Sequence, residues 1–159
     1  MKTSTYSFWF IAGTQDLYGA DVVRQVNDHA QIIANALDQD PAVPGHVVCM
    51  PAVRNAQEIT DVLVKASADE ACAGVITWMH TFSPSKMWIG GLTRLTKPWL
   101  HLHTQFQRDI PWNEIDMDYM NLNQSAHGDR EHGFIGARLR LPRKVIAGHW
   151  EDGETRARV

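Results

Sequence analysis

The sequence predicts a doubly wound α/β domain with about five parallel strands and helices on both faces of the sheet. Three observations carry this prediction. Short apolar segments of strand length alternate with amphipathic helical patterns along the chain. Segment 73–79 is almost unbroken in hydrophobicity, as expected of a parallel strand covered on both faces. Segment 7–12 is followed by Gly13, a polar loop and a helical pattern, which is typical of the first unit of such a sheet.

The first half of the chain predicts three strands and two helices. The strands are 7–12, 46–50 and 73–79, and Pro51 stops the second. Asn55 is a plausible N-cap, with Glu58 three residues later, for a helix continuing to about residue 66. The first helix has an apolar stripe at helical spacing and is ended by the proline-containing segment 38–45. This stripe consists of Val22, Val23, Val26, Ala30, Ile33 and Leu37.

The second half predicts strands 99–103 and 144–148 and three further helices. Ser83 followed by Pro84 predicts a helix start, and Pro98 ends that helix. Its apolar positions are Met87, Trp88, Leu92 and Leu95. Two shorter helical patterns follow, which we expect over 116–128, ending at Gly128, and over 129–141, ending at Pro142. The charged residues 151–159 only begin a helical pattern, so we expect a chain cut within a larger protein.

Composition excludes several functional classes. A chain of 159 residues forms one domain of ordinary size, and a net charge of −3 offers no basic face for nucleic acid. No apolar run is long enough to span a membrane, and no secretory signal is visible, so we expect a cytoplasmic protein. Cys49 and Cys72 both lie in apolar runs and are expected to be reduced core residues. Eight histidines and six tryptophans are unusual for this length and suggest binding.

The residues at the carboxyl ends of the predicted strands indicate a ligand class, because ligands of parallel α/β sheets bind at that edge. Amides, hydroxyls, imidazoles and aromatic rings predominate there, and they suit a neutral polyol better than a phosphate. They are Thr14, Gln15, Tyr18, His80, Thr81, Phe82, His103, Thr104, Gln105, His149 and Trp150. The insert before the last strand adds Asn121, Asn123, Gln124, Ser125 and His127.

Other kinds of site have weaker support. Gly13 and Gly19 flank five residues, which matches neither the dinucleotide fingerprint nor a P-loop. His101 and His103 share one strand face and could ligate a metal, but we favour one packed histidine and one bonded to a loop. No nucleophilic triad, CxxC pair or paired metal carboxylates can be found.

Several residues have a structural and a functional interpretation. Asp116 and Asp118 could act as acid and base, but at a helix start they more simply complement the helix dipole. Gln124 and His127 fit C-terminal helix capping and ligand contact equally well. We expect four tryptophans to lie mostly in the core, namely Trp78, Trp88, Trp99 and Trp112.

Four long, non-repetitive segments closely resemble the L-arabinose isomerase family, whose members interconvert L-arabinose and L-ribulose in the cytoplasm. They are 8–19, 78–89, 103–106 and 115–128. The resemblance covers essentially the whole chain but only about the first third of the family's length. It implies that 1–150 form the N-terminal Rossmann-like or flavodoxin-like domain of such an enzyme. Residues 151–159 would then begin a helix that leads to further domains.

The resemblance also implies a shared active site. Five residues match the family's substrate contacts: Gln15, Leu17, Tyr18, Gln124 and His127. The family is a hexamer of two trimers, and its N-terminal domain contributes these contacts to the metal centre of a neighbouring subunit. The metal, usually Mn²⁺, is held by glutamates and histidines of later domains, so we expect no catalytic or metal-ligating residue in this chain. The alternative is a stand-alone carbohydrate-binding or regulatory α/β module.

Overall fold

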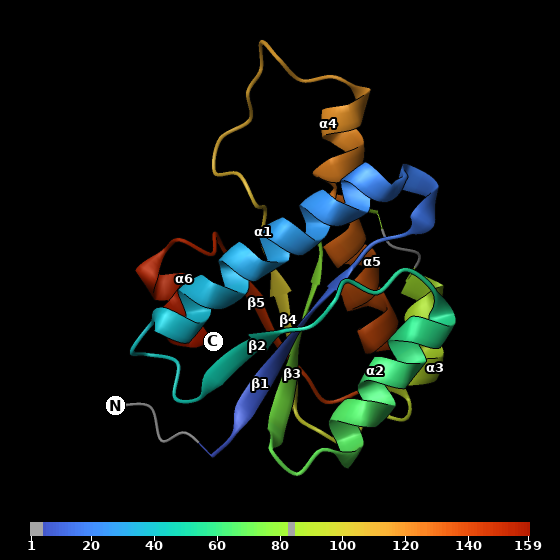
Figure 1. Ribbon diagram of the computed structural model, residues 1–159, viewed down its shortest axis with the longest axis vertical. Helices are drawn as coiled ribbons and strands as arrows, with labels where there is room; N and C mark the ends of the chain where they lie inside the picture. The colour runs from blue at the N-terminus through green and yellow to red at the C-terminus, as the bar shows by residue number, and fades with distance from the viewer. Residues whose placement is uncertain (1–4, 83–84) are drawn as a thin grey trace.

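The computed structural model describes residues 5–82 and 85–159, which form a five-stranded sheet with helices on both faces (Figure 1). Every pair of neighbouring strands is parallel, in the order β2-β1-β3-β4-β5. The strands are β1 (Ser7–Gly13), β2 (His46–Cys49), β3 (Cys72–Met79), β4 (Trp99–His103) and β5 (Lys144–Ala147). The helices are α1 (Ala20–Gln39), α2 (Ala56–Ala68), α3 (Ile89–Leu92), α4 (Met117–Leu122), α5 (Ser125–Arg138) and α6 (Gly153–Arg158). The predicted doubly wound α/β fold is therefore confirmed.

Two apolar cores lie on the opposite faces of the sheet. On one face, the buried stripe of α1 packs against the strands, with Val159, which follows α6, at its margin. On the other face, α2 and α3 pack beside Trp88 and Trp99, and Ile135 of α5 lies at the edge of this core. Because successive strand residues point to opposite faces, Phe10 enters the first core and its neighbour Ile11 enters the second.

The predicted third helix is much shorter than its apolar spacing suggested. Its expected start at Ser83 and Pro84 lies outside the described residues. From Ser85 a single 3₁₀ turn, η2 (Ser85–Trp88), leads into the one-turn helix α3. Two glycines in α3 disfavour a longer helix. The second, Gly91, allows α3 to approach α2, because a Cβ atom there would lie 2.8 Å from Leu63 Cδ1.

The boundary between the next two helices was also predicted wrongly. We expected it at Gly128, but the chain leaves helical geometry at Asn123 and Gln124, and α5 then continues through Gly128. The glycine does not end a helix. A Cβ atom at this position would lie 2.8 Å from the Thr81 carbonyl oxygen and 3.1 Å from Met79 Cβ, so Gly128 allows α5 to lie close to the end of β3.

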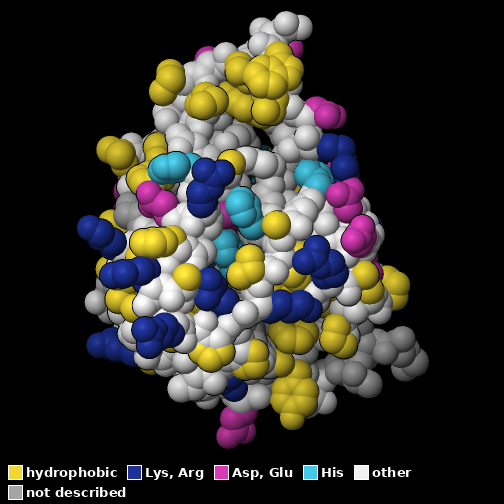
Figure 2. All heavy atoms as spheres, turned by 180° about the vertical axis from the view of Figure 1, so that it is seen from behind, with side chains coloured by type: hydrophobic (Ala, Val, Ile, Leu, Met, Phe, Trp, Pro, Cys, Tyr) yellow, Lys and Arg dark blue, Asp and Glu magenta, His cyan; other side chains and the backbone are white. Residues whose placement is uncertain are grey.

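Trp112 was predicted to lie in the core and is instead 74% exposed, whereas Trp78, Trp88 and Trp99 are buried. Trp112 belongs to a segment that projects from the carboxyl edge of the sheet and includes α4 (Figure 1). Figure 2 shows hydrophobic side chains gathered on this projection. We call it the apolar arm, defined by the exposed side chains Ile110, Trp112, Met117 and Met120.

Both cysteines are free thiols, as expected, but only Cys72 is fully buried. Cys49 is half-buried at the margin of the first core, and burial raises its pKa to about 11. In the described part of the chain, no helix is both long and apolar enough to cross a membrane.

Candidate functional site

The candidate site lies at the carboxyl ends of β1 and β3. From β1 the chain crosses through α1 to β2 on one side, and from β2 it returns through α2 to β3 on the other side. The strand order therefore changes direction between β1 and β3, and in open α/β sheets the ligand crevice forms at this point. The loop 14–19 follows β1, and residues 80–82 follow β3.

The two loops are joined by a hydrogen bond from a side chain to a backbone carbonyl. Gln15 Nε2 donates to the Phe82 carbonyl oxygen at 2.8 Å, and the same nitrogen lies 3.3 Å from the Tyr18 hydroxyl. Beneath them, the buried hydroxyls of Thr81 and Thr14 are 2.9 Å apart, with Thr81 donating. Gln15 is consequently held in a fixed orientation across the crevice.

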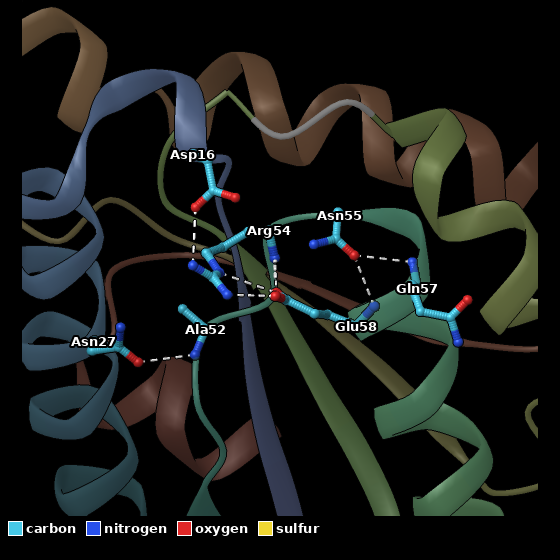
Figure 3. Close-up of polar contacts among 7 residues, drawn as sticks. All are labelled: Asp16, Asn27, Ala52, Arg54, Asn55, Gln57 and Glu58. Carbon is cyan, nitrogen blue, oxygen red and sulfur yellow. Dashed lines mark hydrogen bonds and ion pairs between the residues drawn. The ribbon is translucent and has the colours of Figure 1, made fainter.

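A cluster of charged side chains braces the outer part of loop 14–19 (Figure 3). Arg54 extends from the segment before α2, and its Nη1 lies 3.0 Å from Asp16 Oδ1. Its Nη2 lies 2.5 Å from Glu58 Oε1, and its backbone N–H donates to Glu58 Oε2 at 2.8 Å. Solvent reaches all three side chains, so the brace limits the position of the loop without contributing much stability.

The start of α2 is capped as predicted. Asn55 Oδ1 accepts hydrogen bonds from the backbone N–H groups of Gln57 and Glu58 at 3.1 and 3.0 Å (Figure 3). Glu58 reaches back to the backbone of Arg54, one residue before the cap, so the pair resembles a capping box. Glu58 thus connects the helix cap to the brace on Asp16.

Gln124 and His127 approach the same edge from α5. The backbone N–H of Gln124, the residue before α5, donates to the His80 carbonyl oxygen at 2.9 Å. The His127 ring lies 4.9 Å, centroid to centroid, from the ring of Phe82. The His127 side chain is 58% exposed, and its Nε2 is 4.0 Å from Glu131. The functional alternative for Gln124 and His127 is therefore compatible with the geometry.

The five predicted sugar-contacting residues thus do not form a closed pocket within this chain. Gln15 and His127 both contact Phe82, Tyr18 contacts Gln15, and Gln124 is anchored nearby through residue 80. Leu17 is 82% exposed on the same loop. Beside Phe82 a cavity of about 360 Å³ opens toward α5, and Phe134 and Ile135 contribute to its lining.

Several other residues of the strand-end inventory are internal supports. Thr104 is buried and accepts a hydrogen bond from the Trp150 backbone N–H at 3.0 Å. His80 is fully buried, stacked on Trp78, and its Nε2 lies 2.7 Å from His29 Nδ1. Burial lowers the pKa of His80 to about 3, so this imidazole is neutral at neutral pH.

His101 is packed in the interior, as the structural interpretation predicted, but its partner is a helix residue: its Nε2 lies 2.8 Å from Asp129 Oδ1 of α5. His103 is half-buried, and the expected hydrogen bond from one of the two histidines to a loop stays a prediction. Among residues 5–82 and 85–159, no group of three or more His, Cys, Asp or Glu side chains could hold a metal ion. Asp116 is the N-cap of α4 and accepts from the Tyr119 backbone N–H, so the structural interpretation holds for it as well.

Sequence reasoning overlooked three residues that shape this edge. Phe82 was noted only as a strand-end aromatic ring, whereas its carbonyl oxygen anchors Gln15 and its ring contacts His127. Arg54 and Asp129 carried no recognisable motif. Arg54 matters through its contact with Asp16, and Asp129 through its contacts with Met79 and His101. These partners are distant in sequence.

Fold and geometry together define a doubly wound α/β domain whose switch point carries amide, imidazole and aromatic side chains. Residues 2–159 match the family model described as the L-arabinose isomerase N-terminal domain. The chain belongs to this family.

Curated relatives agree with this assignment. The chain is 60% identical over 154 residues to an L-arabinose isomerase of Geobacillus thermodenitrificans. It is 61% identical to one of Geobacillus stearothermophilus and 59% identical to one of Thermotoga maritima. Each match covers 97% of this chain and 31% of the relative. The chain therefore spans about a third of the length of the relatives it matches.

Proposed function

We propose that this chain is the N-terminal domain of an enzyme that isomerises L-arabinose to L-ribulose. Family membership and the names of the relatives support this reaction. The structural observation that carries the proposal is that Gln15 and His127 both contact Phe82 at the β1–β3 switch point, with Tyr18 beside Gln15. These are neutral hydrogen-bonding and aromatic groups, as a sugar requires.

The domain's part in this reaction is to orient the sugar. Gln15, Gln124 and His127 hydrogen-bond hydroxyls away from the reacting carbons, since amides and imidazoles can both donate and accept. Leu17 and Tyr18 cover the sugar and exclude water. Each lost hydrogen bond to a neutral hydroxyl costs about 0.5–1.5 kcal/mol, or roughly two- to tenfold in kcat/KM. A lost positional constraint costs more.

The family reaction implies a divalent metal, which we assign as Mn²⁺. The described residues do not fit such an ion, because they contain no cluster of three suitable side chains. We therefore assign the metal ligands to parts of the longer protein outside this chain. Bound there, the ion would polarise the sugar oxygens during proton transfer between C1 and C2.

We further propose a cytoplasmic hexamer of two trimers, in which the domain's sugar contacts complete a neighbouring subunit's site. Two features of the surface favour assembly. Leu17 is largely exposed although it stands in the candidate site, and the apolar arm exposes four large hydrophobic side chains beside the same edge. Exposed apolar patches of this kind are typical of protein–protein contacts.

Ketose formation from L-arabinose with added Mn²⁺ tests the proposal. We expect turnover by the longer protein and none by the isolated 159-residue chain. Turnover by the isolated chain would refute the assignment of the metal and catalytic groups to other domains. Calorimetric titration of the isolated chain with L-arabinose or ribitol tests the alternative. Sub-millimolar binding by a monomer would favour a stand-alone carbohydrate-binding module.

A further inference from the structure

The start of α5 is fixed to the end of β3 by a buried carboxylate. Asp129 is fully buried, and its Oδ1 accepts a hydrogen bond from the Met79 backbone N–H at 3.0 Å. The same oxygen lies 2.8 Å from His101 Nε2 on β4. One side chain of α5 therefore contacts the last residue of β3 and the middle of β4.

The position of Asp129 is explained by the geometry of the sheet. β3 and β4 are paired only from Val75↔Trp99 to Thr77↔His101, whereas β3 continues to Met79. Asp129 accepts from Met79 beyond the last paired residue, where the ladder between these strands has ended. An apolar side chain at position 129 would leave this buried N–H without a partner.

Burying a carboxyl group to attach a helix costs desolvation free energy. Burial raises the pKa of Asp129 well above its usual range and lowers the pKa of His101 to about 4. Well-packed apolar residues often replace such buried polar pairs without loss of stability. Apolar packing has no preferred direction, whereas hydrogen bonds do. The hydrogen bonds of Asp129 therefore fix the register and rotation of α5 relative to the strands.

This constraint acts next to the candidate site. Asp129 is two residues after His127 and five after Gln124. Gly128 also lets this turn lie close to the strand end, because a Cβ atom there would clash with the Thr81 carbonyl. One side of the turn is thus fixed in the interior, while His127 on the other side is exposed beside Phe82.

We propose that Asp129 is a positioning residue that holds Gln124 and His127 at the sugar-binding edge. It acts through the start of α5 and touches neither the crevice nor a ligand. The inference rests on the proposed function in one respect: the sugar is what Gln124 and His127 are positioned to bind.

The test is Asp129→Asn in the longer protein, which preserves side-chain volume but replaces the carboxyl group with an amide, a weaker hydrogen-bond acceptor than a carboxylate. Amide hydrogen exchange should increase about tenfold in residues 124–128, and exchange in α1 and α2 should stay unchanged. KM for L-arabinose should increase about two- to tenfold, as expected for weakened sugar contacts. Asp118→Asn is the matched control, because Asp118 is exposed in the first turn of α4; it should alter neither readout.

A second pair of variants decides the question if Asp129→Asn does not fold. His101→Leu removes the partner of Asp129 and should increase exchange in 124–128. His101→Gln can place an amide N–H near the same position and should restore protection. Unchanged exchange in 124–128, or an equal increase throughout the domain, would overturn the positioning role. If the wild-type longer protein forms no ketose, the proposed function fails, but the exchange data still decide the role of Asp129.

Discussion

Acid should destabilise this domain because it buries imidazoles in neutral form. His80 provides the simplest case. It is fully buried, stacks on Trp78 with ring centroids 4.4 Å apart, and contacts His29 at 2.7 Å. Burial is the largest cause that lowers its pKa from 6.5 to about 3, and the neighbouring His29 lowers it further. Protonating His80 in the folded chain would place an imidazolium charge where water cannot solvate it.

The sign and size of the effect follow from the two pKa values. Because the folded value lies below the unfolded value, the unfolded chain binds the proton first as the pH falls. Above pH 6.5 His80 is neutral in both the folded and the unfolded chain and costs no stability. The free energy of unfolding then falls progressively as the pH drops from 6.5 toward 3. At pH 5 the loss from His80 is about 2 kcal/mol, a large part of a typical domain stability of about 5–15 kcal/mol.

Urea unfolding of the chain at pH 7.5 and pH 5 measures this loss. His80→Gln removes the titrating group, so the difference in unfolding free energy between the two pH values should shrink by about 2 kcal/mol relative to wild type. Gln31→Ala is the control and should leave the difference unchanged, because it removes no titrating group and Gln31 is exposed on α1. An undiminished pH dependence in His80→Gln would refute the reasoning.

Two further perturbations test the packing around the site. Gly128→Ala and Gly133→Ala both improve helix propensity in α5. A Cβ atom at 128 would lie 2.8 Å from the Thr81 carbonyl oxygen, whereas a Cβ atom at 133 would meet its nearest neighbour at 3.5 Å. Thermal unfolding should show Gly128→Ala less stable than Gly133→Ala by about 1–3 kcal/mol, and equal stabilities would contradict the close approach. Asn55→Ala should cost about 1 kcal/mol in urea unfolding through loss of the α2 cap; an unchanged midpoint would show that the cap is not needed.

The fold could be predicted because its determinants are local. Segment 73–79 has the continuous apolar character of a covered parallel strand, and α1 has a helical stripe, so alternation alone indicated the doubly wound sheet. The boundary near Gly128 could not be predicted, because that glycine serves a contact with Thr81, 47 positions earlier in the chain. Local sequence alone cannot distinguish a glycine that ends a helix from one that permits close packing.

The candidate site could be predicted only in part. The strand-end rule identified Gln15 and Tyr18, and the insert before the last strand added His127. In the structure Gln15 and His127 both contact Phe82, and Tyr18 lies beside Gln15. The same rule also selected Thr104, whose hydroxyl is used inside the domain. Residue type gives the chemistry of a side chain, but whether that side chain faces a ligand depends on packing between distant segments.

The most direct test of the central claim is the rate of ketose formation by the longer enzyme carrying Gln15→Ala. Gln31→Ala is the matched control, because Gln31 is exposed on α1 and its side chain bonds Asn35 on the same helix. If this domain supplies sugar contacts, Gln15→Ala should lower kcat/KM for L-arabinose at least two- to tenfold, as roughly expected for one lost hydrogen bond. Gln31→Ala should match wild type. Equal kcat/KM for Gln15→Ala and wild type would contradict the claim.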